Sequence, residues 1–219
     1  MVKKKTLLTT SVAAVAAGVA SQTQAGPMFT WDGNGHTYEL TLNEFYSWTD
    51  ARQLALDKGG YLATITSQEE QDAVASFVFG QLFGDGDFDW AVWLGGYDAD
   101  NEESWVWADG PEAGQQFWQG KDDGSPTDGA FVNWDGGEPN FIFGLDEDYL
   151  GLYVFGGEWN DFPNDPVNLL THPITTGLQA LIEYDSPPGG SVPIPGTAAL
   201  TLLGLAGLGL ASRKRKKAS

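Results

Sequence analysis

Apolar residues recur at intervals of three and four in two stretches, which predicts two amphipathic helices. The first stretch, SWTDARQLALDK at residues 47–58, is ended by two glycines. Its predicted buried face consists of Trp48, Ala51, Leu54 and Ala55. The second stretch begins at Ser67, has Glu70 at capping-box spacing and continues to about Val78. Its predicted buried face consists of Ala73, Val74, Phe77 and Val78.

Short runs rich in aromatic and aliphatic residues, closed by Gly, Asn, Asp or Pro, predict strands. These runs are YLATI (61–65), AVWLGGY (91–97), SWVWADG (104–110), YLGLYVF (149–155) and GLQALIEYD (177–185). Between them, residues 111–140 hold few aliphatic side chains and are expected to be irregular. An irregular segment of this length is uncommon inside a compact domain unless it is functional or held by a ligand.

The first 25 residues, MVKKKTLLTTSVAAVAAGVASQTQA, are typical of a secretory signal peptide. Three lysines precede an apolar run, and Thr23-Gln24-Ala25 is a small-x-small ending. We therefore expect export through the Sec pathway and cleavage after Ala25. The alternative is an uncleaved anchor, although the apolar run is short for a permanent membrane span.

A second apolar segment, residues 192–211, is long enough to cross a bilayer and is followed by the basic tail SRKRKKAS. The basic residues are expected to stay in the cytoplasm, which leaves the preceding chain outside. This end resembles a bacterial PEP-CTERM sorting signal, with a Pro-x-Pro motif, an apolar helix and a basic tail. The resemblance implies recognition by an exosortase-type sorting enzyme, although Ile194 replaces the glutamate that is usual in the motif. A plain carboxy-terminal membrane anchor is the alternative.

These ends leave one domain of ordinary size at residues 26–186, then a linker at 187–191 and the sorting segment at 192–219. Only three of the 11 basic residues lie in the domain, namely Arg52, Lys58 and Lys121, whereas all 30 acidic residues do. The exported domain therefore carries a net charge of about −27. Nucleic acid is excluded as a partner because its binding requires lysine and arginine to neutralise phosphates. Cations are favoured, but an acidic surface can also serve solubility alone.

Cysteine is absent, so the chain has no disulfide, thiolate metal site or cysteine nucleophile. The histidines, His36 and His172, are far apart in sequence and form no ligand-spaced cluster. Zinc binding and a catalytic triad are therefore disfavoured, and each histidine is expected to be solvated or locally hydrogen-bonded.

The stretch NWDGGEPN, residues 133–140, places a carboxylate and a carboxamide on either side of Pro139 within the predicted irregular region. With its neighbours in the chain it resembles the C-type lectin-like domain family over roughly residues 29–185. The shared motifs, in order, are WTDARQLALDKGGYLATI (48–65), SQEEQD (67–72), WLGG (93–96), WVWADG (105–110), NWDGGEPN and EWND (158–161). The resemblance implies an α+β fold in which two helices flank antiparallel sheets and a long loop carries a calcium site.

The same resemblance implies the ligands of that site. Calcium and sugar are both expected to be bound by Glu138, Asn140, Glu147, Asn160 and Asp161. Carboxylate and amide oxygens suit calcium, which takes six to eight oxygen ligands. The family holds the proline between the first two ligands cis, so a cis Pro139 is expected, with a trans turn as the alternative. The Glu-x-Asn order goes with mannose-, glucose-, N-acetylglucosamine- or fucose-type ligands.

An auxiliary calcium site is also expected, at Asp98, Glu102 and Asp148 together with Glu147. Phe141 stands where a further carboxylate would help this site. The stretch GDGDFD, residues 84–89, alternates aspartates as an EF-hand does but lacks that loop's glycine and glutamate, so we interpret it as a solvated turn.

Two departures from the family are visible. The positions of its usual disulfide cysteines hold Ala55, Tyr149, Asn164 and Ile182. The two bridges would each contribute roughly 2 to 4 kcal/mol, so aromatic packing by the tryptophans is expected to compensate. An insertion near residues 111–130 carries Phe117 and Trp118, for which core closure is favoured over stacking on a sugar.

The predicted function is calcium-dependent carbohydrate binding by an exported surface or matrix protein. The alternative is a lectin-like module for protein recognition or structure, in which calcium only orders the loop. An enzyme with paired carboxylates is disfavoured because nothing raises Glu138 or Glu147 above the role of ligands.

Overall fold

The computed structural model describes residues 25–83, 90–140, 146–168 and 175–189. The predicted signal peptide, apart from Ala25, the sorting segment, the 84–89 turn, Phe141 and His172 lie outside these ranges. Neither helix within them has the length and apolarity needed to cross a bilayer.

The two predicted helices are confirmed, with α1 at Trp48–Asp57 and α2 at Gln68–Leu82. Ser47 caps α1 by accepting a hydrogen bond from the amide of Asp50, and Ser67 caps α2 through the amide of Glu70. The Glu70 carboxylate reaches back one residue further than a standard capping box, to the amide of Thr66 at 2.8 Å. The helix starts were therefore readable from local sequence, because caps satisfy amides that the helix itself leaves unbonded.

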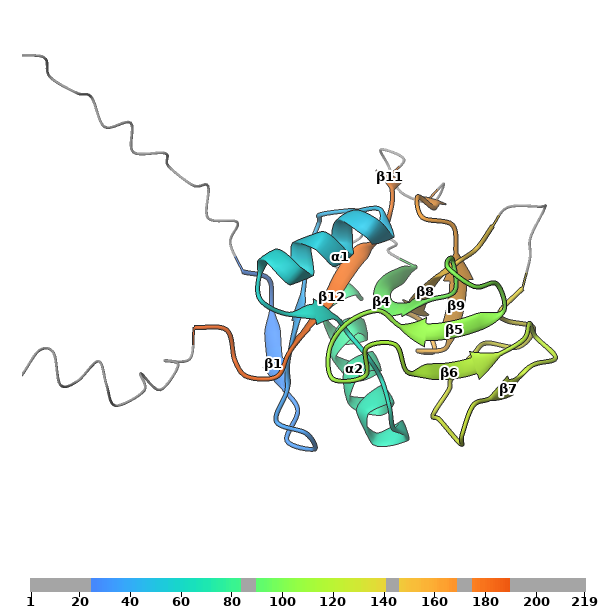
Figure 1. Cartoon of the computed structure of the whole chain (residues 1–219). Helices are drawn as coiled ribbons and strands as arrows, with labels where there is room; N and C mark the ends of the chain where they lie inside the picture. Colours follow the sequence, from blue (N-terminus) through green and yellow to red (C-terminus); the bar gives the residue numbers. More distant parts are fainter. Residues whose placement is uncertain (1–24, 84–89, 141–145, 169–174, 190–219) are drawn as a thin grey trace, which may run out of the picture.

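The strands form one large sheet with the order β1-β2-β12-β4-β5-β6-β7, while β3 pairs with β12, and β8 joins β4 to β9. Figure 1 shows α1 and α2 beside its first half and the site-bearing strands β8 and β9 at the other side of the domain. The strand bounds are β1 Met28–Thr30, β2 Thr37–Leu40, β3 Tyr61–Leu62, β4 Ala91–Tyr97, β5 Ser104–Trp107, β6 Gln116–Gln119, β7 Ser125–Pro126, β8 Tyr149–Tyr153, β9 Trp159–Phe162 and β12 Gln179–Tyr184, with a separate pair β10 Val167–Asn168 and β11 Thr175–Thr176.

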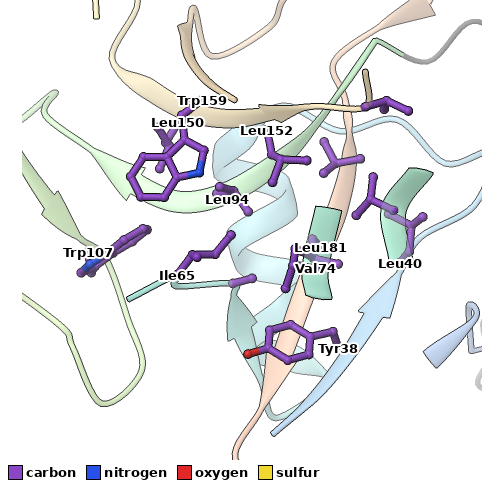
Figure 2. Packing of buried hydrophobic residues seen from close by; sticks show 14 of the residues in the cluster. Tyr38, Leu40, Ile65, Val74, Leu94, Trp107, Leu150, Leu152, Trp159 and Leu181 are labelled. Carbon is purple, nitrogen blue, oxygen red and sulfur yellow. The ribbon is translucent and has the colours of Figure 1, made fainter. Parts of the chain in front are cut away.

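The central strands β4 and β12 run parallel to one another and are buried on both faces. Alternate residues therefore enter two different clusters. On one face, Leu94 of β4 and Leu181 of β12 pack with Val74 of α2. On the other, Trp93 and Ile182 pack with α1. Figure 2 shows part of the first cluster. Burial on both faces explains why the sequences of β4 and β12 are continuous apolar runs.

The structure corrects the sequence prediction in the middle of the chain. The expected 61–65 strand is regular only at β3, and residues expected to be irregular include β6 and β7. Phe117 and Trp118 of β6 are buried in the core, which confirms core closure. Ala55 and Ile182, which stand at two positions where the family usually has cysteine, pack in one apolar cluster. Apolar packing thus occupies two of the positions where the family resemblance implied cysteines.

A buried acidic network lies beside the first cluster, at the end of β12. Glu183 is 1% exposed and contacts the His36 ring at 2.6 Å, a partner 147 positions away in sequence rather than the local one that was expected. The hydroxyl of Tyr38 donates to Glu70 at 2.5 Å, and the amide of Thr64 donates to Glu183 at 2.9 Å. Burial, opposed by the His36 and Thr64 hydrogen bonds, raises the pKa of Glu183 to about 7.

Candidate functional site

The strand that carries two of the five predicted ligands is held by a buried tryptophan. Trp159, at the start of β9, is fully buried, and its indole N–H donates to the Gln71 side chain of α2 at 2.8 Å. Its backbone is bonded to the loop that precedes the proline: its amide donates to Asn133 and its carbonyl accepts from Asp135. These bonds fix the glutamate-proline-asparagine turn in register with β9.

The turn itself brings the first two predicted ligands to the strand. The amide of Glu138 donates to the carbonyl of Asp135 at 3.1 Å, and the Glu138–Pro139 bond is cis, which confirms that prediction. The amide of Asn140 donates to the carboxylate of Asp161 at 2.8 Å, and the Asn140 side-chain amide donates to Glu138. Residues 21 positions apart in sequence therefore meet at one point.

Two carboxylates lie side by side at this point. Asp161 is 1% exposed, and its side chain is hydrogen-bonded to that of Glu138. Burial, followed by the neighbouring Glu138, raises the pKa of Asp161 to about 9, and burial also raises the pKa of Glu138. Two like charges in contact, one buried and one half-buried, are unfavourable unless a proton or a cation lies between them. The local electrostatics therefore favour a proton on this pair or a bound cation in its place.

Several buried oxygens near this pair accept no hydrogen bond within the described part of the chain. They are Oδ1 of Asp98, Oδ1 of Asn140 and Oδ1 of Asp161. All three residues line one hollow of ≈ 20 Å³, enough for a single occupant of the size of a water molecule or an ion. Buried polar atoms normally have partners, so three acceptor oxygens around one such space indicate a missing electropositive partner.

The same hollow joins the principal and auxiliary sites predicted from the sequence. Its walls include Asn140, Glu147 and Asp161 of the first set and Asp98, Glu102 and Asp148 of the second. Asp98 is held by its own amide, which donates to the Asp148 carbonyl at 3.1 Å, and by the amide of Glu103, which donates to its carboxylate. Burial, opposed by that bond but reinforced by the charges of Glu102 and Asp148, raises the pKa of Asp98 to about 7.

Two of the five predicted calcium ligands lie outside the lining of this hollow. Glu138 and Asn160 are not among the residues that line the hollow. The side-chain amide of Asn160 donates to the backbone carbonyl of Asp161 instead. Within the described ranges, no three Asp, Glu, His or Cys side chains converge closely enough to hold a metal by themselves. A cation here would therefore depend on amide and backbone oxygens as well as carboxylates.

Besides Gly120, sequence reasoning missed three residues of the hollow. Trp105 of β5 is buried beside it, and Glu103 and Lys121 form an ion pair at its edge, with 3.7 Å between Oε1 and Nζ. Glu103 is the last residue of the turn between β4 and β5 and has a positive φ of 64°. Nothing in the sequence indicates that a glutamate adopts this backbone conformation. Lys121 enters because β6 pairs with β5, a register that sequence spacing does not reveal.

Comparison with known proteins places this arrangement in a family. The profile of the "Lectin C-type domain" matches residues 44–143. Halomucin of Haloquadratum walsbyi is 37% identical over 135 residues, which are 58% of this chain but only 1% of halomucin. A "C-type lectin mannose-binding isoform" of Oxyuranus scutellatus is 30% identical over 134 residues, covering 59% of this chain and 71% of that protein.

Among solved structures, the mouse scavenger receptor C-type lectin carbohydrate-recognition domain shares 27% identity, with a TM-score of 0.47, over 69% of this chain and 90% of that one. Family membership is carried by the sequence relatives, since the snake lectin aligns over most of its own length. The protein belongs to the C-type lectin family.

Proposed function

We propose that the domain binds carbohydrate in a calcium-dependent manner through Glu138, Asn140, Glu147, Asn160 and Asp161. The observation that carries this proposal is the pair of buried acceptor oxygens without hydrogen-bond partners, on Asn140 and Asp161, next to two carboxylates in contact. An ion with a preference for oxygen ligands suits such a set, whereas zinc, which prefers nitrogen and sulfur, does not.

Each side chain has a defined part in this proposal. Asp161 and Glu138 supply negative charge, and Asn140 supplies a neutral amide oxygen between them. The backbone bond from Asn140 to Asp161 holds the turn against β9, so that the oxygens are oriented before a ligand arrives. The ion, when bound, supplies positive charge and open coordination positions for two neighbouring sugar hydroxyls.

The sugar class follows from the order of side chains in the turn. A carboxylate before the proline and a carboxamide after it go, in the resemblance, with mannose-, glucose-, N-acetylglucosamine- or fucose-type ligands. The snake relative bears the description "mannose-binding", which agrees with this choice. We therefore expect vicinal hydroxyls of the mannose type to be preferred over those of galactose.

Asp98, Glu102 and Asp148, together with Glu147 and backbone oxygens, are proposed to hold an auxiliary calcium ion. Asp98 fits this role because its Oδ1 is buried without a hydrogen-bond partner and its carboxylate is raised in pKa by burial and neighbouring acids. A cation here would neutralise acids that otherwise repel one another across the hollow. It would also fix the turn between β4 and β5 against the segment that precedes β8.

The setting of the domain is proposed from the two ends of the chain. Residues 1–25 direct export and are removed, and residues 192–219 anchor the chain in the membrane until an exosortase-type enzyme recognises the Pro-x-Pro motif. The lectin domain then faces the outside, at the cell envelope or beyond it, where glycans and exopolysaccharides occur. Single-domain binding would gain avidity from display of many copies on a surface.

A second function, protein recognition with calcium only ordering the loop, is favoured by one observation. Glu138 and Asn140 bind each other through their side chains, and Asn160 binds the backbone of Asp161. Side-chain NH2 groups satisfied in this way need no sugar. The two functions differ in what happens when calcium is present but no sugar is offered.

Glycan-array binding of the chain lacking residues 1–25, with calcium and then with a chelator, tests the proposal. We expect signal on mannose-type sugars that disappears in chelator. The double variant Glu138→Gln/Asn140→Asp should shift preference toward galactose, whereas Glu69→Gln, which repeats the first of these substitutions at an exposed position of α2, should not. Sugar binding that persists in chelator would overturn the ion-dependent mechanism. Calcium-dependent stabilisation with no sugar binding would favour the second function.

A further inference from the structure

A second charged cluster lies on the other side of the domain, where the described chain begins. Residues 25–27 run beside β2: the carbonyl of Pro27 accepts from the amide of Leu40 at 3.1 Å, and β1 then pairs with β2. This arrangement places the nitrogen of Gly26 2.9 Å from Oε1 of Glu39. Figure 1 shows this segment next to β1, away from β8 and β9.

Glu39 is an unusual residue for this position because it is charged and only 1% exposed. Its Oε1 accepts from Lys58 Nζ at 2.5 Å as well as from Gly26, and its Oε2 accepts from the Tyr184 hydroxyl at 2.6 Å. Burial acts to raise the pKa of Glu39, but the bonds from Lys58, Tyr184 and Gly26 outweigh it, so the pKa lies below its ordinary value. Glu39 is therefore a buried carboxylate, charged at neutral pH.

The space around this carboxylate carries unbalanced charge while Gly26 is in a peptide bond. A hollow of ≈ 390 Å³ is lined by Gly26, Glu39, Glu44 and Lys58 among others. The charged side chains among the described residues that line it are two carboxylates, Glu39 and Glu44, and one ammonium group, Lys58. A second cation near Glu39 would balance the charges, and the hollow has room for one with its water.

Gly26 is fitted to bring its nitrogen to this place. A Cβ built at Gly26 would lie 1.8 Å from the carbonyl oxygen of Leu40, which is backbone and cannot move aside. Any other residue would push the segment away from β2 and the nitrogen away from Glu39. The absence of a side chain at residue 26 is thus a structural requirement of the contact.

We propose that cleavage after Ala25 converts the Gly26 nitrogen into a free α-ammonium group that pairs with Glu39 and completes this charge cluster, so that export processing stabilises the folded domain. The inference rests on the proposed removal of residues 1–25. An export-type endopeptidase hydrolyses the Ala25–Gly26 peptide bond with one water molecule. The water oxygen is added to the Ala25 carbonyl carbon to give a carboxylate, and both water protons end on the Gly26 nitrogen, which becomes an ammonium group. A neutral donor becomes a charged one at the same position, and charge-assisted hydrogen bonds are the stronger kind.

The pH dependence has a defined sign. The titratable groups around the new amine are Glu39 of β2, Glu44 in the loop between β2 and α1, Lys58 after α1, and Tyr184 of β12 through its bond to Glu39. An α-amine ordinarily titrates near 7.7–8.0. Pairing with Glu39 raises this value in the folded state, so the extra stability is complete below the ordinary value and is lost as pH rises through the raised one.

The test compares two chains in detergent, both continuing to Ser219: one beginning at Gly26 and one beginning at Ala25. The added residue moves the free amine by about 3.8 Å along the chain and leaves an ordinary amide at Gly26. We expect amine acylation, followed by mass spectrometry at pH 8, to be at least about tenfold slower for the chain beginning at Gly26. Its melting temperature should also be higher at pH 7, and the difference should vanish near pH 10.

Two variants keep the proposal testable if one fails to fold. Glu39→Gln should abolish the difference between the two chains. Lys58→Met leaves the carboxylate with the new amine as its main cation and should widen the difference. Equal acylation rates and equal melting temperatures for the two unmutated chains would overturn the pairing. Sequencing of the exported protein separately tests cleavage, so a different natural first residue would refute the processing step and leave the pairing result standing.

Discussion

Replacing Asp161 by asparagine should stabilise the metal-free protein while it abolishes calcium binding. Asp161 is 1% exposed, its Oδ2 accepts from the Asn140 amide, and its carboxylate contacts that of Glu138. Because its pKa lies near 9, Asp161 is protonated in the folded state at pH 7 but ionised in the unfolded chain. Asparagine can keep the acceptor for the Asn140 amide and needs no proton at this position.

The magnitude follows from the proton. Holding an aspartic acid protonated at pH 7, about three units above its ordinary pKa, costs the folded state at most about 4 kcal/mol. We expect asparagine to recover about half of this, or roughly 2 kcal/mol, since its amide must still pack. For a domain of this size that corresponds to a rise of about 4–8 °C in melting temperature. Calcium at a thousand times its Kd should stabilise the unmutated protein by about 4 kcal/mol and the variant not at all, which reverses the order.

Differential scanning calorimetry in chelator and in calcium measures both effects. In chelator, the free energy of unfolding of the unmutated protein should fall as pH rises from about 4 to 9, because the folded state binds the Asp161 proton more tightly than the unfolded chain does. The variant should lack this contribution to the pH dependence. Asp165→Asn, the same substitution at an exposed aspartate four positions further along the chain, serves as the control. A variant that is less stable in chelator, or one that still gains stability from calcium, would refute the assignment of Asp161.

The remaining predictions concern the framework of the site. Trp159→Phe removes the donor to buried Gln71 and leaves its oxygen unpaired, so chemical denaturation should show a loss of about 2–4 kcal/mol together with weaker calcium binding, and an effect below 1 kcal/mol would contradict this. Glu183→Gln should flatten the fall in stability expected from about pH 4.5 to 7, a range over which ionisation of the raised carboxyl destabilises the fold; an unchanged pH profile would contradict this role. Gly95→Ala should be strongly destabilising, since its Cβ would lie 2.5 Å from the carbonyl oxygen of Leu62, whereas Gly80→Ala, in open space on α2, should stabilise by about 0.5–1 kcal/mol; equal melting temperatures would contradict both.

Local sequence determined the helices, their caps and the central strands. Ser47 and Ser67 cap helices because a side-chain oxygen close in sequence reaches the free amides of the first turn, and this needs no distant partner. The runs that became β4 and β12 were readable because both of their faces are buried. The glutamate-proline-asparagine turn and the tryptophan-asparagine-aspartate strand were visible as motifs that resemble a known family, and the cis bond was expected on that basis.

Only the tertiary structure decided how these pieces meet. Trp159 bonded to Gln71, Asn140 bonded to Asp161, and Lys121 brought beside Glu103 all depend on pairings between segments far apart in the chain. Asn140, Glu147 and Asp161 of one predicted ligand set and Asp98, Glu102 and Asp148 of the other line one hollow. Phe117 proved to be core, because burial is set by what packs on a residue rather than by its neighbours in sequence. Likewise, the contact between Gly26 and Glu39 arises from the pairing of β1 with β2, which sequence spacing alone does not specify.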